Sequence, residues 1–219
     1  MPTLYGVFRS RASRPIWLLY ELDATFDHVP VIQAYRLRDA RAADAPLNTA
    51  SPAFLKVNPI GQIPAWVEDD LVLTESLAIT NHIARTRGGD LGPNTPAEAA
   101  HLDQWTLLAV TAVEGPALEI QTITGQGGDK TAEGQAAISI CAERLRRPLA
   151  RLEAHLSAQA YLLGDRFTVA DLNLAECLRY AQGHPTLLGE FPAVKAWLEV
   201  CQSRTAFKKM WAARMAEPV

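Results

Sequence analysis

Residues 58–76 read Asn-Pro-Ile-Gly-Gln-Ile-Pro-Ala-Trp-Val-Glu-Asp-Asp-Leu-Val-Leu-Thr-Glu-Ser. The stretch opens with an asparagine, a proline and a glycine, which are turn-forming residues. Two short apolar runs follow, and the Glu-Asp-Asp sequence between them is typical of a β-hairpin turn. Apolar residues then recur at helical spacing after Ser76. The stretch therefore predicts a turn, two strands and the start of a helix.

Two details of this stretch indicate a ligand site. In Ile63-Pro64, the proline lies in a strand-like run, where it removes a hydrogen-bond donor and is tolerated mainly at a sheet edge. A cis bond, which only about 5–6% of X–Pro bonds adopt, would leave the N–H and C=O groups of Ile63 to pair with an extended ligand. Glu75-Ser76 at a helix start would suit both ends of an amino-acid group. The Glu75 carboxylate would take the ammonium group. The Ser76 hydroxyl and the helix N–H groups would take the carboxylate, because helix N-termini favour anions. A solvated first turn is the simpler interpretation of an isolated Glu-Ser pair.

The order of these motifs resembles the glutathione-binding half of the glutathione S-transferase family. The resemblance implies that Pro64 is cis and that Ile63 pairs through its backbone with the cysteinyl part of glutathione. It also implies that Glu75 and Ser76 hold the γ-glutamyl end. Gln62 matches a position that often contacts the cysteinyl-glycine portion. Several matched positions in the correct order within 19 residues make the signal specific.

Composition narrows the class of protein. A chain of 219 residues suits one or two domains, and the formal net charge of −3, without a basic stripe, argues against nucleic acid as a partner. The start has no signal-peptide pattern and no apolar run reaches membrane-spanning length, so we expect a cytoplasmic protein without a membrane partner. The three cysteines, Cys141, Cys177 and Cys201, lack CxxC spacing. Buried thiols are the expected result, which disfavours dithiol redox chemistry, and we expect no metal.

The first part of the chain predicts a thioredoxin-like domain. Strand patterns at 3–8 and 26–32 flank a helical stripe, which together form a βαβ unit. Residues 33–57 predict a long loop with an irregular helix, before the hairpin and the helix that starts at Glu75. The resulting order, β-α-β-α-β-β-α, agrees with the resemblance.

The rest of the chain predicts an all-α domain. Residues 86–97 have the glycine and proline content of a linker. Beyond them only helical patterns occur, with a kink or a split expected at Gly115-Pro116 and a kink at Pro148. The predicted helices span 97–123, 131–158, 168–181 and 192–203, with a last one from 203. The predicted organisation is a thioredoxin-like glutathione-binding domain at 1–85, a linker at 86–97 and an all-helical domain at 98–219, with a frayed end at 217–219.

Thr168 and Asp171 form a capping-box pattern at the start of a predicted helix. A catalytic aspartate is the alternative interpretation, but the capping role accounts for the pair. The glutathione S-transferase family has the same Thr-x-x-Asp motif at the start of a buried helix in its helical domain. We therefore assign the pair to folding.

A residue that activates the glutathione thiol is expected in the loop after the first strand. Conjugation needs the thiolate, because the thiol is a poor nucleophile. Ser10 matches the activating serine of the serine-using classes, which resemble phi, theta and zeta transferases, and it is our first choice. Ser13 is the second choice, with helix N-capping as its alternative role. Tyr5 is the third, and packing in the sheet is its simpler role.

Several nearby positions leave alternatives open. Arg9, Arg11 and Arg14 would either favour the thiolate or be solvated charges. Ser10-Arg11-Ala12 departs from the Ser-Ser-Cys signature of zeta-type isomerases, which weakens an assignment as a maleylacetoacetate isomerase. Ala50 stands where phi-like enzymes carry a basic residue that binds the glycine carboxylate of glutathione. The substitutes that remain open are Thr49, Asn48, Lys56, Arg36 and Arg38.

The resemblance implies a glutathione transferase that uses glutathione as co-substrate and attacks a small hydrophobic electrophile, with detoxification as its role. Reduction of organic hydroperoxides is a further expected activity, and a homodimer is the expected assembly. A glutathione-dependent isomerase and a non-catalytic glutathione-binding scaffold are the alternatives. The candidates for the electrophile pocket are Phe8, Arg11, Trp105, Thr111 and Glu114. Core packing is an equally good interpretation of Trp105.

Overall fold

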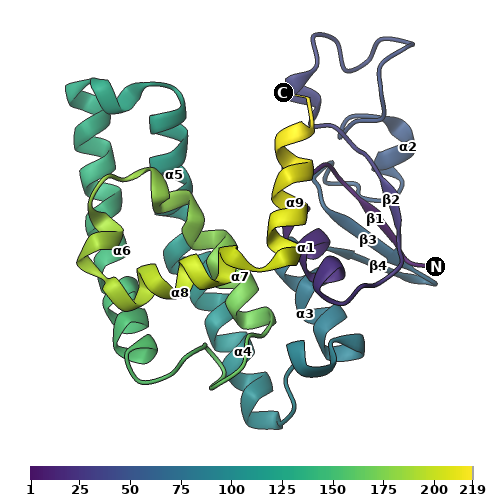
Figure 1. Cartoon of the computed structure of the whole chain (residues 1–219). Coiled ribbons are helices and arrows are strands. Elements are labelled where there is room, and N and C mark those ends of the chain that lie inside the picture. The colour runs from purple at the N-terminus through teal and green to yellow at the C-terminus, as the bar shows by residue number, and fades with distance from the viewer. Residues whose placement is uncertain (219) are drawn as a thin grey trace. The chain divides into compact units, whose positions relative to one another are not determined.

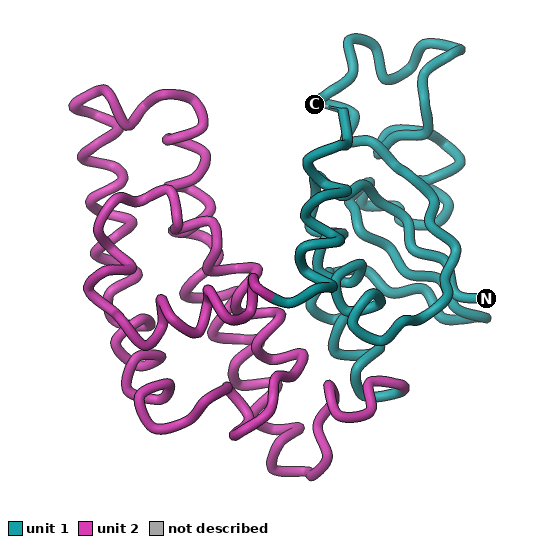
Figure 2. Tube along the Cα trace, in the orientation of Figure 1, with its two compact units in different colours: residues 1–86, 204–219 teal, residues 87–203 magenta. Residues whose placement is uncertain are grey.

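The computed structural model describes residues 1–218, and the chain forms two compact units (Figure 2). Unit 1 consists of residues 1–86 together with the segment that begins at Arg204, and unit 2 consists of residues 87–203. The predicted division placed all of 98–219 in the helical domain. The structure differs at the end, because the last helix packs on unit 1.

Unit 1 is built on a four-stranded sheet (Figure 1). The strand order is β2 (Asp27–Val29), β1 (Thr3–Tyr5), β3 (Ala65–Glu68) and β4 (Leu71–Thr74). β1 is parallel to β2 and antiparallel to β3, which forms a hairpin with β4. The fold is the predicted thioredoxin-like arrangement, but β1 and β2 are shorter than predicted. Gly6, at a φ of 147°, follows β1, and Pro30, which has no N–H to donate, follows β2.

Helix α1 (Ser13–Glu21) connects β1 to β2 and is buried from Ser13 to Leu19. Helix α9 (Thr205–Ala216) packs against α1, as Figure 1 shows. Phe207 of α9 meets the indole of Trp17 edge-on at 4.9 Å between ring centroids. Arg204 forms two hydrogen bonds to the Glu21 carboxylate, at 2.7 and 2.8 Å. These contacts explain why the final segment of the chain belongs to unit 1.

The remaining elements of unit 1 are short except for one helix. They are the 3-10 helix η1 (Ala34–Arg36), α2 (Pro52–Leu55) and α3 (Ser76–Arg87). Most of 33–57 is therefore loop, as predicted, and the buried Asn48 organises it. The Asn48 amide donates to the carbonyls of Ala40 and Pro46, at 3.0 and 2.8 Å, and accepts from the N–H of Ala50 at 2.9 Å.

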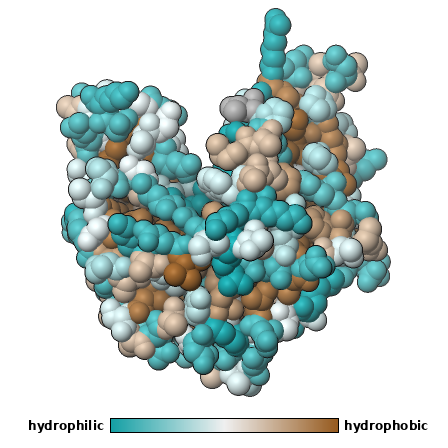
Figure 3. Space-filling model, viewed as in Figure 1, coloured by the Kyte–Doolittle hydropathy of each residue, from teal (hydrophilic) through white to brown (hydrophobic). Residues whose placement is uncertain are grey.

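Unit 2 is helical in the part of the chain that the structure describes, and none of the helices in residues 1–218 has the length and apolar character needed to cross a membrane. On the face drawn in Figure 3, hydrophobic and hydrophilic residues are intermixed over both units. The principal helices of unit 2 are α4 (Pro96–Leu108), α5 (Glu114–Gly125), α6 (Ala132–Leu156), α7 (Val169–Leu178) and α8 (Pro192–Ser203). Shorter turns are η2 (Gly89–Leu91), η3 (Ala109–Val113), η4 (Gly128–Lys130), η5 (Arg179–Gly183) and η6 (Leu187–Glu190).

The two proline positions behave differently. The helical segment predicted at 97–123, with a kink or a split at Gly115-Pro116, is divided by η3, a π-helical turn just before Pro116. Proline has no N–H, and its ring would crowd the carbonyl four residues earlier, here Ala112. A widened turn relieves both problems. Pro148, by contrast, lies within an uninterrupted α6, so it does not divide that segment.

The capping box predicted at the start of α7 is present. The Asp171 carboxylate accepts from the backbone N–H of Thr168 at 2.9 Å and from its hydroxyl at 3.0 Å. Its other oxygen accepts from the N–H of Leu162 and from the indole N–H of Trp197, each at 2.9 Å. Complete burial raises the pKa of Asp171, while these hydrogen bonds act in the opposite direction. One carboxylate thus joins α7, α8 and the segment before α7.

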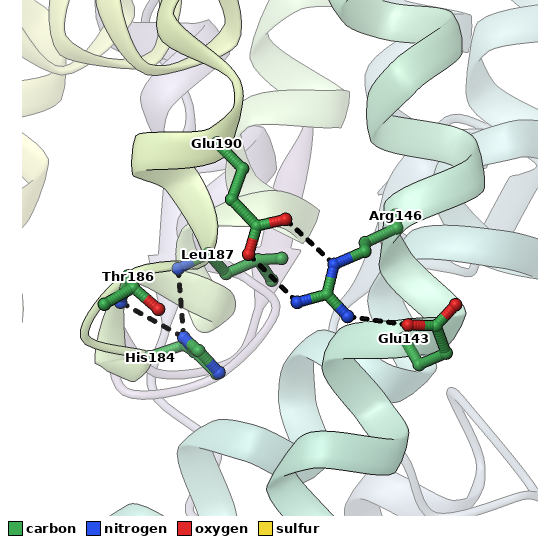
Figure 4. A network of polar contacts seen from close by, with 6 residues as sticks. All are labelled: Glu143, Arg146, His184, Thr186, Leu187 and Glu190. Atoms are coloured by element: carbon green, nitrogen blue, oxygen red, sulfur yellow. Dashed lines mark hydrogen bonds and ion pairs between the residues drawn. The ribbon is translucent and has the colours of Figure 1, made fainter.

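A polar network holds η6 against α6 (Figure 4). Nδ1 of His184 accepts from the backbone N–H groups of Thr186 and Leu187, at 3.2 and 3.0 Å. Glu190, at the end of η6, accepts two hydrogen bonds from Arg146, at 2.8 and 2.9 Å. Because Nδ1 is an acceptor in both contacts, His184 must be neutral at this nitrogen.

This network predicts acid sensitivity in unit 2. Burial lowers the pKa of His184 from its ordinary value of 6.5. As the pH falls below that value the unfolded chain takes up the proton first, so stability present above pH 6.5 is lost on passing through the lower folded pKa. We expect the free energy of unfolding in urea to fall more between about pH 7.5 and about pH 5.5 in the wild type than in His184→Ala. Equal losses in both proteins would assign the acid sensitivity to other groups.

Candidate active site

Ser10 lies half-buried in the loop between β1 and α1. Its hydroxyl donates to the carbonyl of Val7 at 2.7 Å, and its oxygen accepts from the N–H of Ala12 at 3.0 Å. The hydroxyl proton is therefore given to a neutral carbonyl. An anionic acceptor forms a stronger hydrogen bond than a neutral one, so a bound thiolate would compete well for this proton.

The two alternatives to Ser10 as the activating residue, Ser13 and Tyr5, lie in α1 and β1 and not in the loop. Ser13 is the first residue of α1 and is completely buried. The N-cap position belongs to Ala12, which has helical dihedral angles, so the predicted capping role of Ser13 is wrong. Tyr5 lies in β1, and its ring packs 6.1 Å from the ring of Phe54.

Gly6 brings the Ser10 loop close to the segment before β3. A Cβ atom at Gly6 would lie 2.8 Å from the Cβ of Ala12, too close for any other residue, and 3.6 Å from the Cβ of Ile63. The pairing of Tyr5 with Ala65 has the same effect, because it sets the end of β1 beside the start of β3. The Ser10 loop therefore begins next to Ile63-Pro64.

The Ile63–Pro64 peptide bond is cis, as predicted. The expectation of an edge strand is wrong, because β3 lies between β1 and β4. The proline is tolerated because it precedes Ala65, the first residue of the strand, so strand pairing does not require an N–H group at this position. Within residues 1–218 the main-chain N–H and C=O of Ile63 have no hydrogen-bond partner. The neighbouring Gln62 has an exposed side chain, and its carbonyl accepts from Asn58 at 2.7 Å.

Glu75 and Ser76 form the start of α3. Glu75 is exposed and has a φ of 65°, and Ser76 is the first residue of the helix. Nη1 of Arg14 donates to the Ser76 oxygen at 2.9 Å. Since the oxygen already accepts this bond, the Ser76 proton remains to be donated to an anion. Arg14 is 1% exposed, so it also places a buried positive charge at the positive end of the α3 dipole.

This contact corrects one prediction and reveals a role that sequence reasoning missed. A solvated charge was one interpretation of Arg14, and burial in α1 contradicts it. The arginine serves the start of α3, 62 positions away in the sequence. The sequence carried only a weak signal for this role, namely an arginine within an otherwise apolar helical stripe.

The candidates for binding the glycine carboxylate separate into two groups. The side chains of Asn48 and Thr49 are used within the loop, since the Thr49 hydroxyl accepts from the N–H of Ala34 at 2.9 Å. Arg36 donates to the carbonyl of Arg9 at 3.2 Å. Lys56 and Arg38 are exposed, and in residues 1–218 neither side chain makes a hydrogen bond or ion pair.

The predicted electrophile residues lie in different environments. Trp105 is 2% exposed, donates its indole N–H to Leu162 at 3.1 Å and belongs to the core of unit 2. Glu114 is buried near Cys177, whose sulfur lies 3.9 Å from its carboxylate. Thr111 is exposed and donates to the carbonyl of Leu107 at 2.7 Å, while Arg11 is exposed and Phe8 half-buried. All three cysteines are buried, as predicted.

The segment after α9 contacts the Ser10 loop, which the sequence did not predict. The Glu217 carboxylate accepts from the backbone N–H groups of Phe8 and Arg9, at 3.0 and 2.7 Å. The predicted frayed end is therefore wrong for Glu217, while Val219 lies outside the described residues. No sequence pattern could have linked these groups, which are more than 200 positions apart.

Comparison with known proteins identifies the family of both units. The family described as the glutathione S-transferase N-terminal domain matches residues 2–85, and the C-terminal domain family matches residues 111–205. Glutathione S-transferase 3 of Zea mays is 39% identical over 174 residues, which covers 74% of this chain and 76% of that protein. The chain belongs to the glutathione S-transferase family.

Other glutathione S-transferases match over nearly the whole chain. Glutathione S-transferase F13 of Arabidopsis thaliana is 34% identical over 218 residues, covering 94% of this chain and 93% of the relative. The crystal structure of glutathione transferase F7 from Populus trichocarpa superposes with a TM-score of 0.79 at 33% identity, over 98% and 99% of the two chains. The chain is thus an enzyme of the transferase class, in a family that uses glutathione as co-substrate.

Proposed function

We propose that Ser10 activates the thiol of glutathione, which is bound along Ile63, Glu75 and Ser76. The main chain of Ile63 would pair with the cysteinyl residue, beside the contacts of Gln62. The Glu75 carboxylate would take the ammonium group of the γ-glutamyl end. Ser76 and the first N–H groups of α3 would take its carboxylate, with Arg14 behind them. The observation that carries the proposal is the main chain of Ile63, which has no hydrogen-bond partner within residues 1–218 and lies next to the loop of Ser10.

The chemistry of this site would be thiolate formation followed by attack. A free cysteine thiol has a pKa near ~8.5, and lowering it to ~6.5 requires about 2.7 kcal/mol of preferential stabilisation of the anion. The Ser10 hydroxyl would supply part of this by donating to the sulfur instead of to Val7. The thiol proton passes to solvent. The thiolate electron pair then forms the S–C bond, and the leaving group departs with its own bonding pair or, in an addition, the substrate gains a proton.

The electrophile is proposed to be small and hydrophobic, with organic hydroperoxides as a second substrate class. Phe8 and Arg11, which lie beside Ser10 in the loop of unit 1, remain candidates for contact with it, and Trp105 would act only as support within the core of unit 2. For the glycine carboxylate we favour Lys56 or Arg38, because their charges are exposed and uncommitted within residues 1–218.

We also propose a cytoplasmic homodimer. Large apolar side chains are exposed on an edge strand of the sheet in unit 1 and on the α4–η3 segment of unit 2. Contact with a second copy would remove these groups from water. The residues concerned are Leu71 and Val72 of β4, Leu107 of α4 and Val110 of η3.

The proposal is tested by following the ultraviolet absorbance of the thiolate of bound glutathione over a pH series. We expect the pKa of the bound thiol to lie below the free value of ~8.5. With an activated aryl halide, glutathione should be consumed in equal amount with the electrophile. Binding without a lowered pKa would favour a binding protein, and turnover that returns free glutathione would favour an isomerase.

A further inference from the structure

The carboxylate of Glu217 binds two consecutive backbone N–H groups of the loop that carries Ser10. One oxygen accepts from Phe8 at 3.0 Å and the other from Arg9 at 2.7 Å. Hydrogen bonds from a backbone N–H to a carboxylate are among the stronger kinds in proteins. Each carboxylate oxygen holds one amide, so the contact fixes the orientation of this part of the loop as well as its position.

Two further bonds join the same two segments, one in each direction. Arg9 donates through Nε to the carbonyl of Glu217 at 2.9 Å, and Arg214 donates to the carbonyl of Phe8. The guanidinium of Arg214 also stacks over Trp211 of α9 at 5.4 Å. These two bonds add to those of the Glu217 carboxylate in joining the loop to the segment after α9.

Helix α9 provides a rigid base for these contacts. Arg204 is bound to Glu21 at one end of the helix, and Phe207 packs on Trp17 one turn later. The first turn of α9 is therefore fixed on α1, and the same helix ends at Ala216, next to Glu217.

The position of the Ser10 hydroxyl depends on the backbone that Glu217 holds. Both partners of that hydroxyl, the carbonyl of Val7 and the N–H of Ala12, belong to the same loop. Phe8 and Arg9 are the two residues between Val7 and Ser10. A loop that moved at these residues would move the hydroxyl with it.

We infer that Glu217 is a positioning residue that fixes the Ser10 loop and thereby the hydroxyl that faces the thiol. The inference rests on the proposed role of Ser10. Glu217 does not touch glutathione in this account, so its replacement changes the activation of the thiol and leaves the binding surface of Ile63, Glu75 and Ser76 in place.

The test compares the wild type with Glu217→Ala and Glu217→Gln, and with Glu199→Ala, an exposed glutamate of α8, as control. Amide hydrogen exchange in the absence of ligand should accelerate about tenfold to a hundredfold at Phe8 and Arg9 in Glu217→Ala. The pKa of bound glutathione should rise toward its free value while the dissociation constant of glutathione changes less than about threefold. Glu217→Gln keeps one acceptor oxygen and should lie between the wild type and Glu217→Ala. Thermal unfolding in parallel would identify any general loss of fold.

Two results would overturn the inference. Unchanged exchange at Phe8 and Arg9 would show that Glu217 does not hold the loop. A lower thiol pKa in Glu217→Ala would show that the carboxylate acts through its charge as a restraint on the thiolate. A failure of the proposed function is separate: if Ser10→Ala left the thiol pKa unchanged, the exchange effect of Glu217→Ala would persist but would have no catalytic consequence.

Discussion

Ser10→Ala is expected to reduce kcat/KM for glutathione conjugation about tenfold to a hundredfold, because it removes a hydrogen bond to the charged sulfur worth about 1.5–3 kcal/mol. The same loss should raise the pKa of the thiol of bound glutathione by about one to two pH units. Affinity for glutathione should change little, since the peptide part is held at Ile63, Glu75 and Ser76. The measurements are steady-state kinetics and thiolate absorbance of the bound complex.

Ser13→Ala is the matched comparison for this prediction. Ser13 is buried at the first residue of α1, so its replacement should change the stability of unit 1 and leave the thiol pKa in place. A raised thiol pKa in Ser13→Ala, with wild-type behaviour in Ser10→Ala, would transfer the activating role to Ser13. A lowered pKa that survives both substitutions would assign activation to backbone amides or to an arginine of the loop.

Asp171→Ala is expected to destabilise the protein by about 3–5 kcal/mol, the largest stability effect that the structure suggests. The carboxylate is the acceptor for the backbone N–H groups of Thr168 and Leu162 and for the indole of Trp197. Without it these donors stay buried with no acceptor, and each such donor costs about 1–3 kcal/mol. Urea unfolding followed by tryptophan fluorescence measures the loss.

Asp171→Asn separates hydrogen bonding from volume. The asparagine oxygen can still accept from Leu162 and Trp197, but its NH2 group then faces the N–H of Thr168. We expect a smaller loss, about 1–3 kcal/mol. Asp70→Ala, in the exposed hairpin turn, is the control and should change stability by less than about 0.5 kcal/mol. A loss below that limit in Asp171→Ala would contradict the structural role of the carboxylate.

Local signals in the sequence were sufficient for much of the fold. The cis bond at Pro64 was implied by the family resemblance. The hairpin and the capping box of α7 each depend on residues within a few positions of one another. Turn, cap and helix preferences act over that range, so a single sequence reveals them. The resemblance in the same stretch then led to the family, which the matched domains and relatives confirm.

What the sequence could not reveal depends on distant contacts. Glu217 lies more than 200 positions from its partners, and Arg14 lies 62 positions from Ser76. The π-helical turn before Pro116 shows a further limit, since the proline indicated a disturbance but neither its kind nor its position. Burial could not be predicted for two candidate site residues. Trp105 and Ser13 have suitable side chains for a binding or activating role, but both are buried in the structure.

Unit 1 is assembled from two segments of chain that are separated by the whole of unit 2. During synthesis, the strands and α1 leave the ribosome long before α9, so the face of α1 that receives Phe207 stays uncovered while unit 2 is being made. Domains generally fold as units in the order of their synthesis. Here the second unit can complete its core first, and the unit that begins the chain is finished last.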